Sequence, residues 1–340
     1  MAKGGKRPKL KDIAREVGVS ESAASLALAG KPGVSEATRE KILAVAKEMR
    51  WEPNHAAKVL SGARTEAIGL VLARDMRDVG SEAFFLRFLT GIEEVLSSRG
   101  YGLLVQTVGT AEEEVEVYRR WNATRRVDGV IIVDLRVDDI RPRALKEMGM
   151  PAIITGAADP DALIPALELD DAVVMEQITD FLTGSGHRNI AYVCGDPNLR
   201  HVQDRLAKFE QDVRDAGGEP HWYPTDFSAA SAVEATERAL EKGPSAIIFE
   251  NEFLAIAGVT TIRRHDLAIP GDVSVIMWED SPVAEVVDPP MTAIHRDAFV
   301  LGVEVTGQLL SILDGKEPTV TLDTRPGLVI RGSVTALNNE

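Results

Sequence analysis

Apolar residues recur at helical spacing near the start of the chain and predict two short helices separated by a tight turn. The first helix is expected over roughly Leu10–Val17, and Gly18 ends it. The second is expected to start after Ser20, a good N-cap residue, and to run to about Ala29. Two short helices joined by a glycine-containing turn are typical of a helix-turn-helix unit.

A third helix is expected to complete a small helical head. It should start after Ser35, another N-cap residue, and reach about Arg50. Its apolar residues are Ile42, Leu43, Val45, Ala46 and Met49. After Pro53 a further helical stretch of about two turns ends at Gly62. A helix of this length is too short to be stable alone. We expect this stretch to form only where a partner or DNA holds it, as a link between the head and the rest of the chain.

Beyond residue 64, apolar runs of strand length alternate with helical patterns. The runs include Ile68–Leu72, Leu103–Val108, Val130–Val133, Ala152–Thr155, Ile190–Val193, Ala246–Phe249 and Val273–Met277. The helical patterns include Phe84–Arg99, Ala172–Gly184, His201–Ala216 and Ser231–Lys242. This alternation predicts parallel sheets with helices on both faces, and the length fits two similar halves. Because such sheets bind ligands at the carboxyl ends of their strands, pocket residues are expected just after the runs.

Charge is divided unevenly along the chain. The net charge is −15, yet residues 1–64 carry +6 and the remainder carries −21. A basic head on an acidic body suits a head that meets phosphate, while a merely solvated basic tail is the alternative. The single cysteine excludes an internal disulfide framework, and the six scattered histidines offer no metal cluster. Without a secretory signal or a membrane-spanning apolar run, we expect a soluble cytoplasmic protein with no metal and no cofactor.

Several motifs, occurring in a fixed order, carry a family resemblance. They are LKDIAREVGVSESAASLALAGKPGVSEATREKI, PNHAAKVLSG, IGLVL, GIEEVLSSRGY, RRVDGVII, GHRNIAYVCG, IPGDVSVIMWED, DPPMTAI and LVIRGS. With these motifs the chain resembles the lac repressor (LacI/GalR) family of transcription regulators over essentially its whole length. The resemblance implies an N-terminal all-α helix-turn-helix head. It also implies an α/β periplasmic-binding-protein-like body of two doubly wound parallel-sheet halves, with a ligand clamped between them.

The resemblance also implies domain boundaries. The expected domains are a helix-turn-helix DNA-binding head over 1–52, a hinge helix and linker over 53–64, and a ligand-sensing and dimerisation domain over 65–335. The N-half of this last domain is expected over about 65–168 plus 296–323, and the C-half over about 169–295 plus 324–335. The chain should therefore recross between the halves near His295 and Thr324.

In the resembling family the second helix enters the major groove and reads base edges. Carried over, the reading positions are Glu21, Ser22 and Leu26. The positions that mostly touch phosphate are Ser20, Ala23, Ser35 and Thr38, with simple helix capping an equal alternative for the two serines. The DNA-binding positions of the hinge are Asn54, Ala57 and Leu60. Leu60 matches a leucine that wedges into the minor groove, and a packed core leucine is its alternative.

Two positions depart from the family pattern. Lys9 stands where a helix-capping threonine is usual, which predicts a looser start of the first helix. Leu26 stands where a basic residue is common, so it offers only apolar contact, best matched to a thymine methyl group. The alternative is that Leu26 turns inward and packs against Ile42 or Val45.

Aromatic and polar residues after the predicted strands are candidates for a ligand pocket. The resemblance implies aromatic pocket walls at Phe84, Phe85 and Phe227, with core packing an equal alternative for each. It implies that Arg205 holds paired ligand oxygens with its planar guanidinium, and a surface ion pair with Asp204 or Glu210 is the alternative.

The remaining pocket candidates are Asn251, Glu252, Glu279 with Asp280, and Arg296. Carboxylates near an arginine suit the recognition of a polyol by charge-assisted hydrogen bonds. Glu252 and Glu279 stand where the family usually has aspartate, so the pocket is expected to differ in size or shape.

No catalytic motif is complete in this chain. Ser185 lies near His187 but within Gly184-Ser185-Gly186, which is not a nucleophile elbow, and we do not expect an enzyme. We expect a homodimeric repressor that binds a palindromic operator in double-stranded DNA. A sugar-like effector in the cleft is expected to change the operator affinity. The sequence leaves open whether that effector releases the repressor or recruits it.

Overall fold

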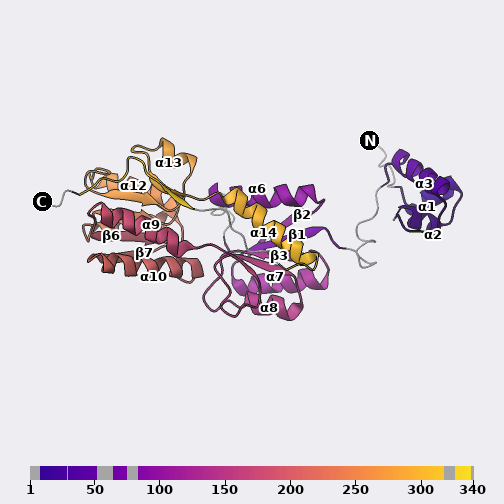
Figure 1. Ribbon diagram of the computed structural model, residues 1–340, viewed down its shortest axis with the longest axis horizontal. Coiled ribbons are helices and arrows are strands. Elements are labelled where there is room, and N and C mark those ends of the chain that lie inside the picture. The colour runs from indigo at the N-terminus through magenta and orange to yellow at the C-terminus, as the bar shows by residue number, and fades with distance from the viewer. Residues whose placement is uncertain (1–7, 29, 52–63, 75–82, 318–325, 338–340) are drawn as a thin grey trace. The chain divides into compact units, whose positions relative to one another are not determined.

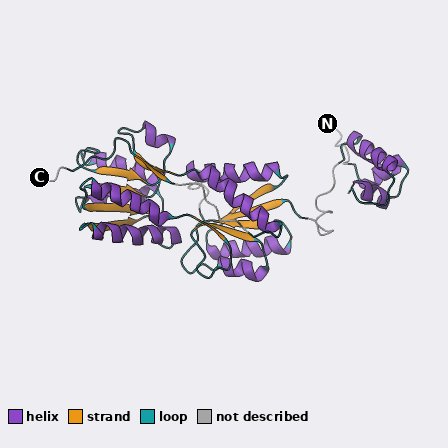
Figure 2. Cartoon of the chain, in the orientation of Figure 1, coloured by secondary structure: helices purple, strands orange, loops and turns teal. Residues whose placement is uncertain are grey.

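The chain folds into two compact units. The structure, a computed structural model, describes residues 8–28, 30–51, 64–74, 83–317 and 326–337. The first unit spans Met1–Thr65 and the second spans Glu66–Glu340, and we call them the head and the body. The hinge candidates Asn54, Ala57 and Leu60 lie outside the described residues, so their roles remain predictions. Figure 1 labels the elements of both units, and Figure 2 colours them by type.

The head is a unit of three helices. These are α1 (Leu10–Val17), α2 (Glu21–Leu28) and α3 (Glu36–Glu48). They pack around the buried side chains of Ile13, Ala27, Ile42 and Ala46. The third helix ends at Glu48 rather than Arg50, and Leu43 is 47% exposed rather than part of this core.

Local hydrogen bonds fix the ends of the head helices. Ser20 Oγ accepts a hydrogen bond from the Ala23 N–H at 3.1 Å, and Ser35 Oγ accepts one from the Thr38 N–H at 3.3 Å. Lys9 supplies no side-chain cap, but its own N–H donates to the Asp12 carboxylate at 2.9 Å. This bond secures the start of α1 that the sequence predicted to be looser.

The first half of the body is built on a parallel five-stranded sheet of order β2-β1-β3-β4-β5. Its strands are β1 (Ala67–Leu72), β2 (Gly102–Thr107), β3 (Gly129–Ile132), β4 (Ala152–Gly156) and β5 (Ala166–Glu168). Its helices are α6 (Ala83–Ser98), α7 (Ala111–Ala123) and α8 (Arg141–Met148). Figure 1 shows α6 on one face of this sheet and α7 and α8 on the other, which explains why β1 and β3 are buried on both faces.

The second half is built on a six-stranded sheet of order β11-β10-β9-β8-β6-β7. Its strands are β6 (Asn189–Cys194), β7 (Glu219–Pro224), β8 (Ala246–Phe249), β9 (Ser274–Met277), β10 (Thr292–His295) and β11 (Gly327–Val329). Its helices are α9 (Asp171–Gly184), α10 (Arg200–Asp215), α11 (Ala229–Leu240), α12 (Glu252–Arg264) and α13 (Pro282–Val286). All pairings are parallel except β10 with β11, which is antiparallel.

The chain crosses between the two halves of the body after β10. The next helix, α14 (Ala298–Leu313), packs on α6 and on the first sheet, and β11 then returns to the second sheet. The helices α6 and α14 approach closely because Gly91 and Gly302 face each other's backbones; a Cβ at Gly302 would lie 2.2 Å from the Phe88 carbonyl oxygen. This close packing fixes α14 as part of the first half, although it follows the last parallel strand of the second.

The sequence did not predict four of the strands, namely β5, β7, β10 and β11. Two of them have only three residues each, and β7 lies at a sheet edge and carries Pro220 and Pro224. Proline is tolerated at an edge because no neighbouring strand needs its missing N–H. Among the described residues, no helix is long and apolar enough to cross a membrane.

Candidate functional site

All eight predicted ligand-site residues line one cavity between the halves of the body, which we call the cleft. They are Phe84, Phe85, Arg205, Phe227, Asn251, Glu252, Glu279 and Arg296. Other parts of its lining follow the carboxyl ends of strands: Asp134 comes after β3, Glu250 after β8 and Trp278 after β9. The sheets therefore deliver polar and aromatic side chains to one place, as expected for open α/β sheets.

Arg205 is buried at the floor of the cleft and holds two carboxylates. Its Nε donates to Asp171 Oδ2 at 2.8 Å, and its Nη1 donates to Glu250 Oε1 at 2.5 Å. The guanidinium also lies 4.0 Å from the centre of the Trp278 ring, within the range of a cation–π contact. Its N–H groups are thus engaged by the protein's own acids, and these in turn line the cleft.

The alternative of a surface ion pair for Arg205 is wrong. Asp204 lies 4.0 Å from Arg200, and Glu210 pairs with Arg214 at 2.8 Å. The partners of Arg205 come instead from the start of α9 and the end of β8, which are distant in the sequence.

Asp171 joins two arginines of the cleft. Arg296 Nη2 lies 2.8 Å from Asp171 Oδ1, while Arg205 occupies Oδ2. Burial alone would raise the pKa of Asp171, but attraction to Arg205 and Arg296 outweighs burial and lowers it to about 2. The carboxyl is therefore ionised throughout the neutral range.

We expect stability to depend on this carboxyl in acid. Because the folded-state pKa of Asp171 is below its ordinary value, its stabilisation is present above about pH 4 and is lost as the pH falls toward 2. The loss should amount to about 2 kcal/mol of unfolding free energy. Urea unfolding of wild type and Asp171→Asn across this range measures the difference. Parallel pH profiles for the two proteins would contradict the prediction.

Three polar atoms of the cleft are buried with neither a hydrogen-bond partner nor an ion-pair partner in the described part of the chain. They are Thr155 Oγ1, Glu252 Oε2 and Arg296 Nε. Buried polar groups are normally paired, and orphaned ones carry a desolvation penalty. A ligand with several hydroxyl groups could accept from Arg296 and donate to the other two oxygens.

The aromatic residues serve the core and the cleft together. Phe85 is 7% exposed and belongs to the core of the first half, whereas Phe84 is half-buried at its margin. Phe227 packs against the cores on both faces of the second sheet, and its ring rests on Gly195, where a Cβ would lie 2.1 Å from it. Core packing and pocket lining are therefore compatible for these residues.

Two of the polar candidates have structural partners of their own. Asn251 Oδ1 caps α12 by accepting a hydrogen bond from the Leu254 N–H at 2.9 Å. Asp280 pairs with Arg331 at 2.8 Å. The carbonyl of the Asn251 side chain is therefore used by the fold, while Glu252 in the next position keeps one carboxylate oxygen without a partner.

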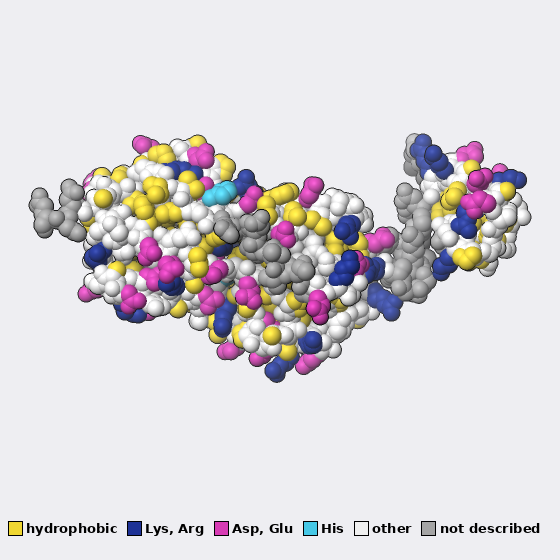
Figure 3. Space-filling view, in the orientation of Figure 1, with side chains coloured by type: hydrophobic (Ala, Val, Ile, Leu, Met, Phe, Trp, Pro, Cys, Tyr) yellow, Lys and Arg dark blue, Asp and Glu magenta, His cyan; other side chains and the backbone are white. Residues whose placement is uncertain are grey.

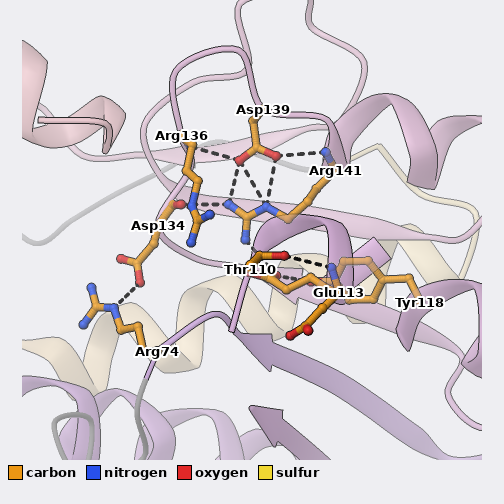
Figure 4. Close-up of polar contacts among 9 residues, drawn as sticks. Arg74, Thr110, Glu113, Tyr118, Asp134, Arg136, Asp139 and Arg141 are labelled. Carbon is orange, nitrogen blue, oxygen red and sulfur yellow. Dashed lines mark hydrogen bonds and ion pairs between the residues drawn. The ribbon is translucent and has the colours of Figure 1, made fainter. Parts of the chain in front are cut away.

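Ion pairs and hydrogen bonds hold a loop after β3 (Figure 4), and the first residues of this loop, Val133 and Asp134, line the cleft. Asp134 pairs with Arg74 at 2.7 Å, and the buried Arg141 holds the loop by donating to Asp139, to Glu114 and to the Asp134 carbonyl. Both Arg74 and Asp134 line the cleft as well as a neighbouring hollow.

The same loop contacts the other half of the body through its backbone. The Val137 N–H donates to the Asn198 carbonyl at 2.9 Å, and the Arg200 N–H donates to the Leu135 carbonyl at 2.7 Å. These two bonds join the halves beside the cleft, so the relative position of the halves is coupled to the residues that line it.

The sequence analysis missed several polar and aromatic residues that line the cleft. They include Arg74, Asp134, Thr155, Asp171, His201, Glu250 and Trp278. A usable signal was present for three of them, because Asp134, Glu250 and Trp278 follow the ends of apolar runs. For His201 no local signal exists; it reaches the cleft from the first turn of α10 and lies 3.9 Å from Glu250.

The predicted DNA-reading residues lie on and beside α2 of the head. Glu21 and Ser22 are exposed, and Leu26 is half-buried. Leu26 is not among the side chains packed on the head core; its Cδ1 lies instead near Gly33, in the loop between α2 and α3. Ala23 is half-exposed, while Ala24 is fully buried. One face of α2, which includes Ala24, therefore packs inward. The predicted reading positions Glu21 and Ser22 lie on the exposed part of the helix.

A helix-turn-helix head joined to a two-halved α/β body with a polar cleft defines a class of protein: a DNA-binding transcription regulator with a ligand-binding-protein-like body. Residues 9–54 match the family described as bacterial regulatory proteins, lacI family, and residues 179–334 match the periplasmic binding protein-like domain. The chain belongs to the LacI family of transcriptional regulators.

Individual relatives agree with this assignment over nearly their whole length. The chain is 30% identical over 337 residues to the HTH-type transcriptional regulator CelR of Thermobifida fusca. This alignment covers 96% of the chain and 98% of CelR. It is 28% identical over 337 residues to the HTH-type transcriptional repressor PurR of Photobacterium profundum, with 97% and 99% covered. A solved complex of the transcriptional regulator CelR with cellobiose matches with a TM-score of 0.71 at 27% identity, covering 96% of this chain and 100% of that chain. These relatives are regulators, not enzymes.

Proposed function

We propose that the protein is a repressor whose affinity for its operator is controlled by a sugar or sugar derivative bound in the cleft. The observation that carries the proposal is the set of buried, unpartnered polar atoms on Thr155, Glu252 and Arg296, which line a cavity with aromatic walls. A sugar offers hydroxyl groups to such atoms and apolar ring faces to Phe84 and Phe227. The relative solved with cellobiose supports a sugar, and the relative named a repressor supports repression.

The cleft supports a route from effector to operator. Its lining comes from both halves, and the backbone bonds of Leu135 and Val137 to residues 198 and 200 join the halves beside it. An effector that prefers one arrangement of the halves shifts the population toward that arrangement. By linkage, operator DNA must change effector affinity by the same factor.

We further propose a homodimer formed through the body. Palindromic operators require two heads related by a two-fold axis. Several large apolar side chains of α6, α12 and α13 are exposed: they are Leu86, Phe253, Ile256 and Val286. A second copy of the chain would bury them, and the head is too small to supply a standard interface of about 800 Å² per partner.

A thermal-shift screen of the full chain against sugars and nucleobases tests the effector proposal. A ligand present at about 100 times its Kd should stabilise the body by about 2.7 kcal/mol. The same ligand should change operator affinity in a binding assay. Stabilisation by a nucleobase and by no sugar would overturn the choice of ligand class.

The position of Leu26, on α2 but outside the packed core of the head, leads to a prediction about operator sequence. If Leu26 contacts bases, its operator position should tolerate or prefer thymine, because leucine has no hydrogen-bond donor. Replacing Leu26 with arginine should shift the preference toward guanine by about 1–3 kcal/mol. Selection from randomised duplexes with both proteins measures this. Identical selected motifs would mean that Leu26 does not face the bases.

The hinge positions Asn54, Ala57 and Leu60 belong to the same proposal. An apolar wedge at Leu60 would unstack a base step and bend the operator.

A further inference from the structure

Three arginines surround a surface hollow of the body. Arg120 lies in the last turn of α7, and Arg125 and Arg126 follow that helix; with Thr124 they line the hollow. All three arginines are exposed. Within the part of the chain that the structure describes none of them forms an ion pair, and Arg120 donates to the neutral side chain of Gln106 at 3.1 Å.

Three arginines that line one hollow without a carboxylate partner among the described residues form a local positive charge on an acidic body. Residues 65–340 carry a net charge of −21, so carboxylates are abundant around the molecule. Arg125 also has a φ of +47°, a left-handed backbone that favours glycine, yet an arginine stands there. Like charges held together repel one another, and an anion in the hollow would relieve that repulsion.

The hollow lies near the point where the chain from the head enters the body. Glu66, the first body residue, donates its N–H to the Asp128 carboxylate at 2.8 Å, and the Asp128 N–H donates to the Ala67 carbonyl at 2.8 Å. Arg126 is two positions before Asp128. Figure 3 shows lysine and arginine side chains gathered at the end of the body where β1 begins. The cluster and the connection to the DNA-binding head thus lie at the same end of the first sheet, where β1 and β3 begin.

A purely structural role explains only part of the cluster. A cation in the last turn of a helix interacts favourably with the helix dipole, which accounts for Arg120. The same effect falls off beyond the last turn and gives no reason for two further arginines after the helix. The positive charge at this end of the sheet therefore indicates a negatively charged partner outside the chain, namely a polyanion.

We propose that Arg120, Arg125 and Arg126 bind phosphate groups of the DNA held by the head. The proposal rests on operator binding by the head and adds a sequence-independent contact made by the body. Exposed charges act over a Debye length of about 8 Å at physiological salt. The cluster therefore attracts phosphates that come near this end of the first sheet. It also offsets the repulsion between the acidic body and the DNA backbone.

The test compares salt dependence of DNA binding by the full chain and by the combined variant Arg120→Gln, Arg125→Gln and Arg126→Gln. The probe is a duplex selected by the wild-type protein from a random-sequence library. The plot of log K against log salt should become shallower by about 0.9 for each phosphate that the variant no longer neutralises. Affinity at low salt should fall about tenfold.

The control carries the same loss of charge elsewhere. Arg214, Arg238 and Arg264 lie in the last turns of α10, α11 and α12, so their combined replacement by glutamine removes the same charge, at helix ends like that of Arg120. The control should keep the wild-type slope.

An unchanged slope in the test variant overturns the proposal, whether or not its melting temperature falls. An unchanged slope accompanied by weaker binding of inorganic phosphate would also overturn it and indicate a site for a small anion that does not contact the DNA. If the wild type selects no duplex at all, operator binding itself has failed.

Discussion

Replacing Arg205 with alanine should lower the unfolding free energy of the body by about 3–5 kcal/mol. The change leaves the carboxylates of Asp171 and Glu250 buried, with their main cation removed, and an uncompensated buried charge is strongly destabilising. Arg296 remains at 2.8 Å from Asp171, so Glu250 should bear most of the loss. Chemical denaturation followed by tryptophan fluorescence measures the effect, because Trp278 lies on the Arg205 guanidinium.

Two further variants separate the buried network from mere loss of a side chain. Arg214→Ala removes an exposed arginine that is paired with Glu210 within one helix, and it should change stability by less than about 0.5 kcal/mol. Adding Glu250→Gln to Arg205→Ala should recover part of the loss, because it removes the unpaired charge. If the single and double variants unfold at the same denaturant concentration, the buried charge is not the cause.

Under folding conditions Arg205→Ala should also lose its response to effector, since the cleft carboxylates are no longer held in place.

Replacing Ile256 with glutamate should convert the protein to a monomer and lower operator affinity by at least about 100-fold. Ile256 is 42% exposed on α12, so a charge there leaves the folded subunit intact, but it would be buried in the proposed dimer without a partner. Loss of the second head removes the gain from simultaneous binding, which spans about 10²–10⁴-fold. Sedimentation gives the mass, and titration of a selected duplex gives the affinity.

Ile140→Glu is the matched control for this experiment. Ile140 is 44% exposed, but it precedes α8, on the opposite face of the first sheet from α6 and α14. This variant should remain dimeric and bind DNA like wild type. A dimeric Ile256→Glu protein would place the interface elsewhere on the body.

The residue pattern was sufficient for most of the local structure. Ser20, Ser35 and Gly18 act within three residues of the helix ends that they fix, so their signal is contained in the sequence itself. The apolar runs of the central strands are equally legible, because strands buried on both faces have few polar positions; these strands are β1, β3, β4, β6, β8 and β9. Edge strands such as β7 lack that signal, since only one neighbouring strand and one side constrain them.

The cleft shows where the sequence alone no longer decides. Positions after strands and family motifs supplied all eight predicted cleft residues, but not what each side chain contacts. Arg205 finds Asp171 and Glu250, which are 34 and 45 residues away, and not its neighbours Asp204 or Glu210. Consecutive residues on a helix point in different directions, so Asp204 is exposed while Arg205 is buried, and the order of strands in the sheet decides which distant residues meet inside. The sequence by itself thus determined the helices of the head, several helices of the body, the main strands and the family. Only the tertiary structure decided which charges are buried together, because burial removes water and leaves the nearest carboxylate as the partner of each arginine.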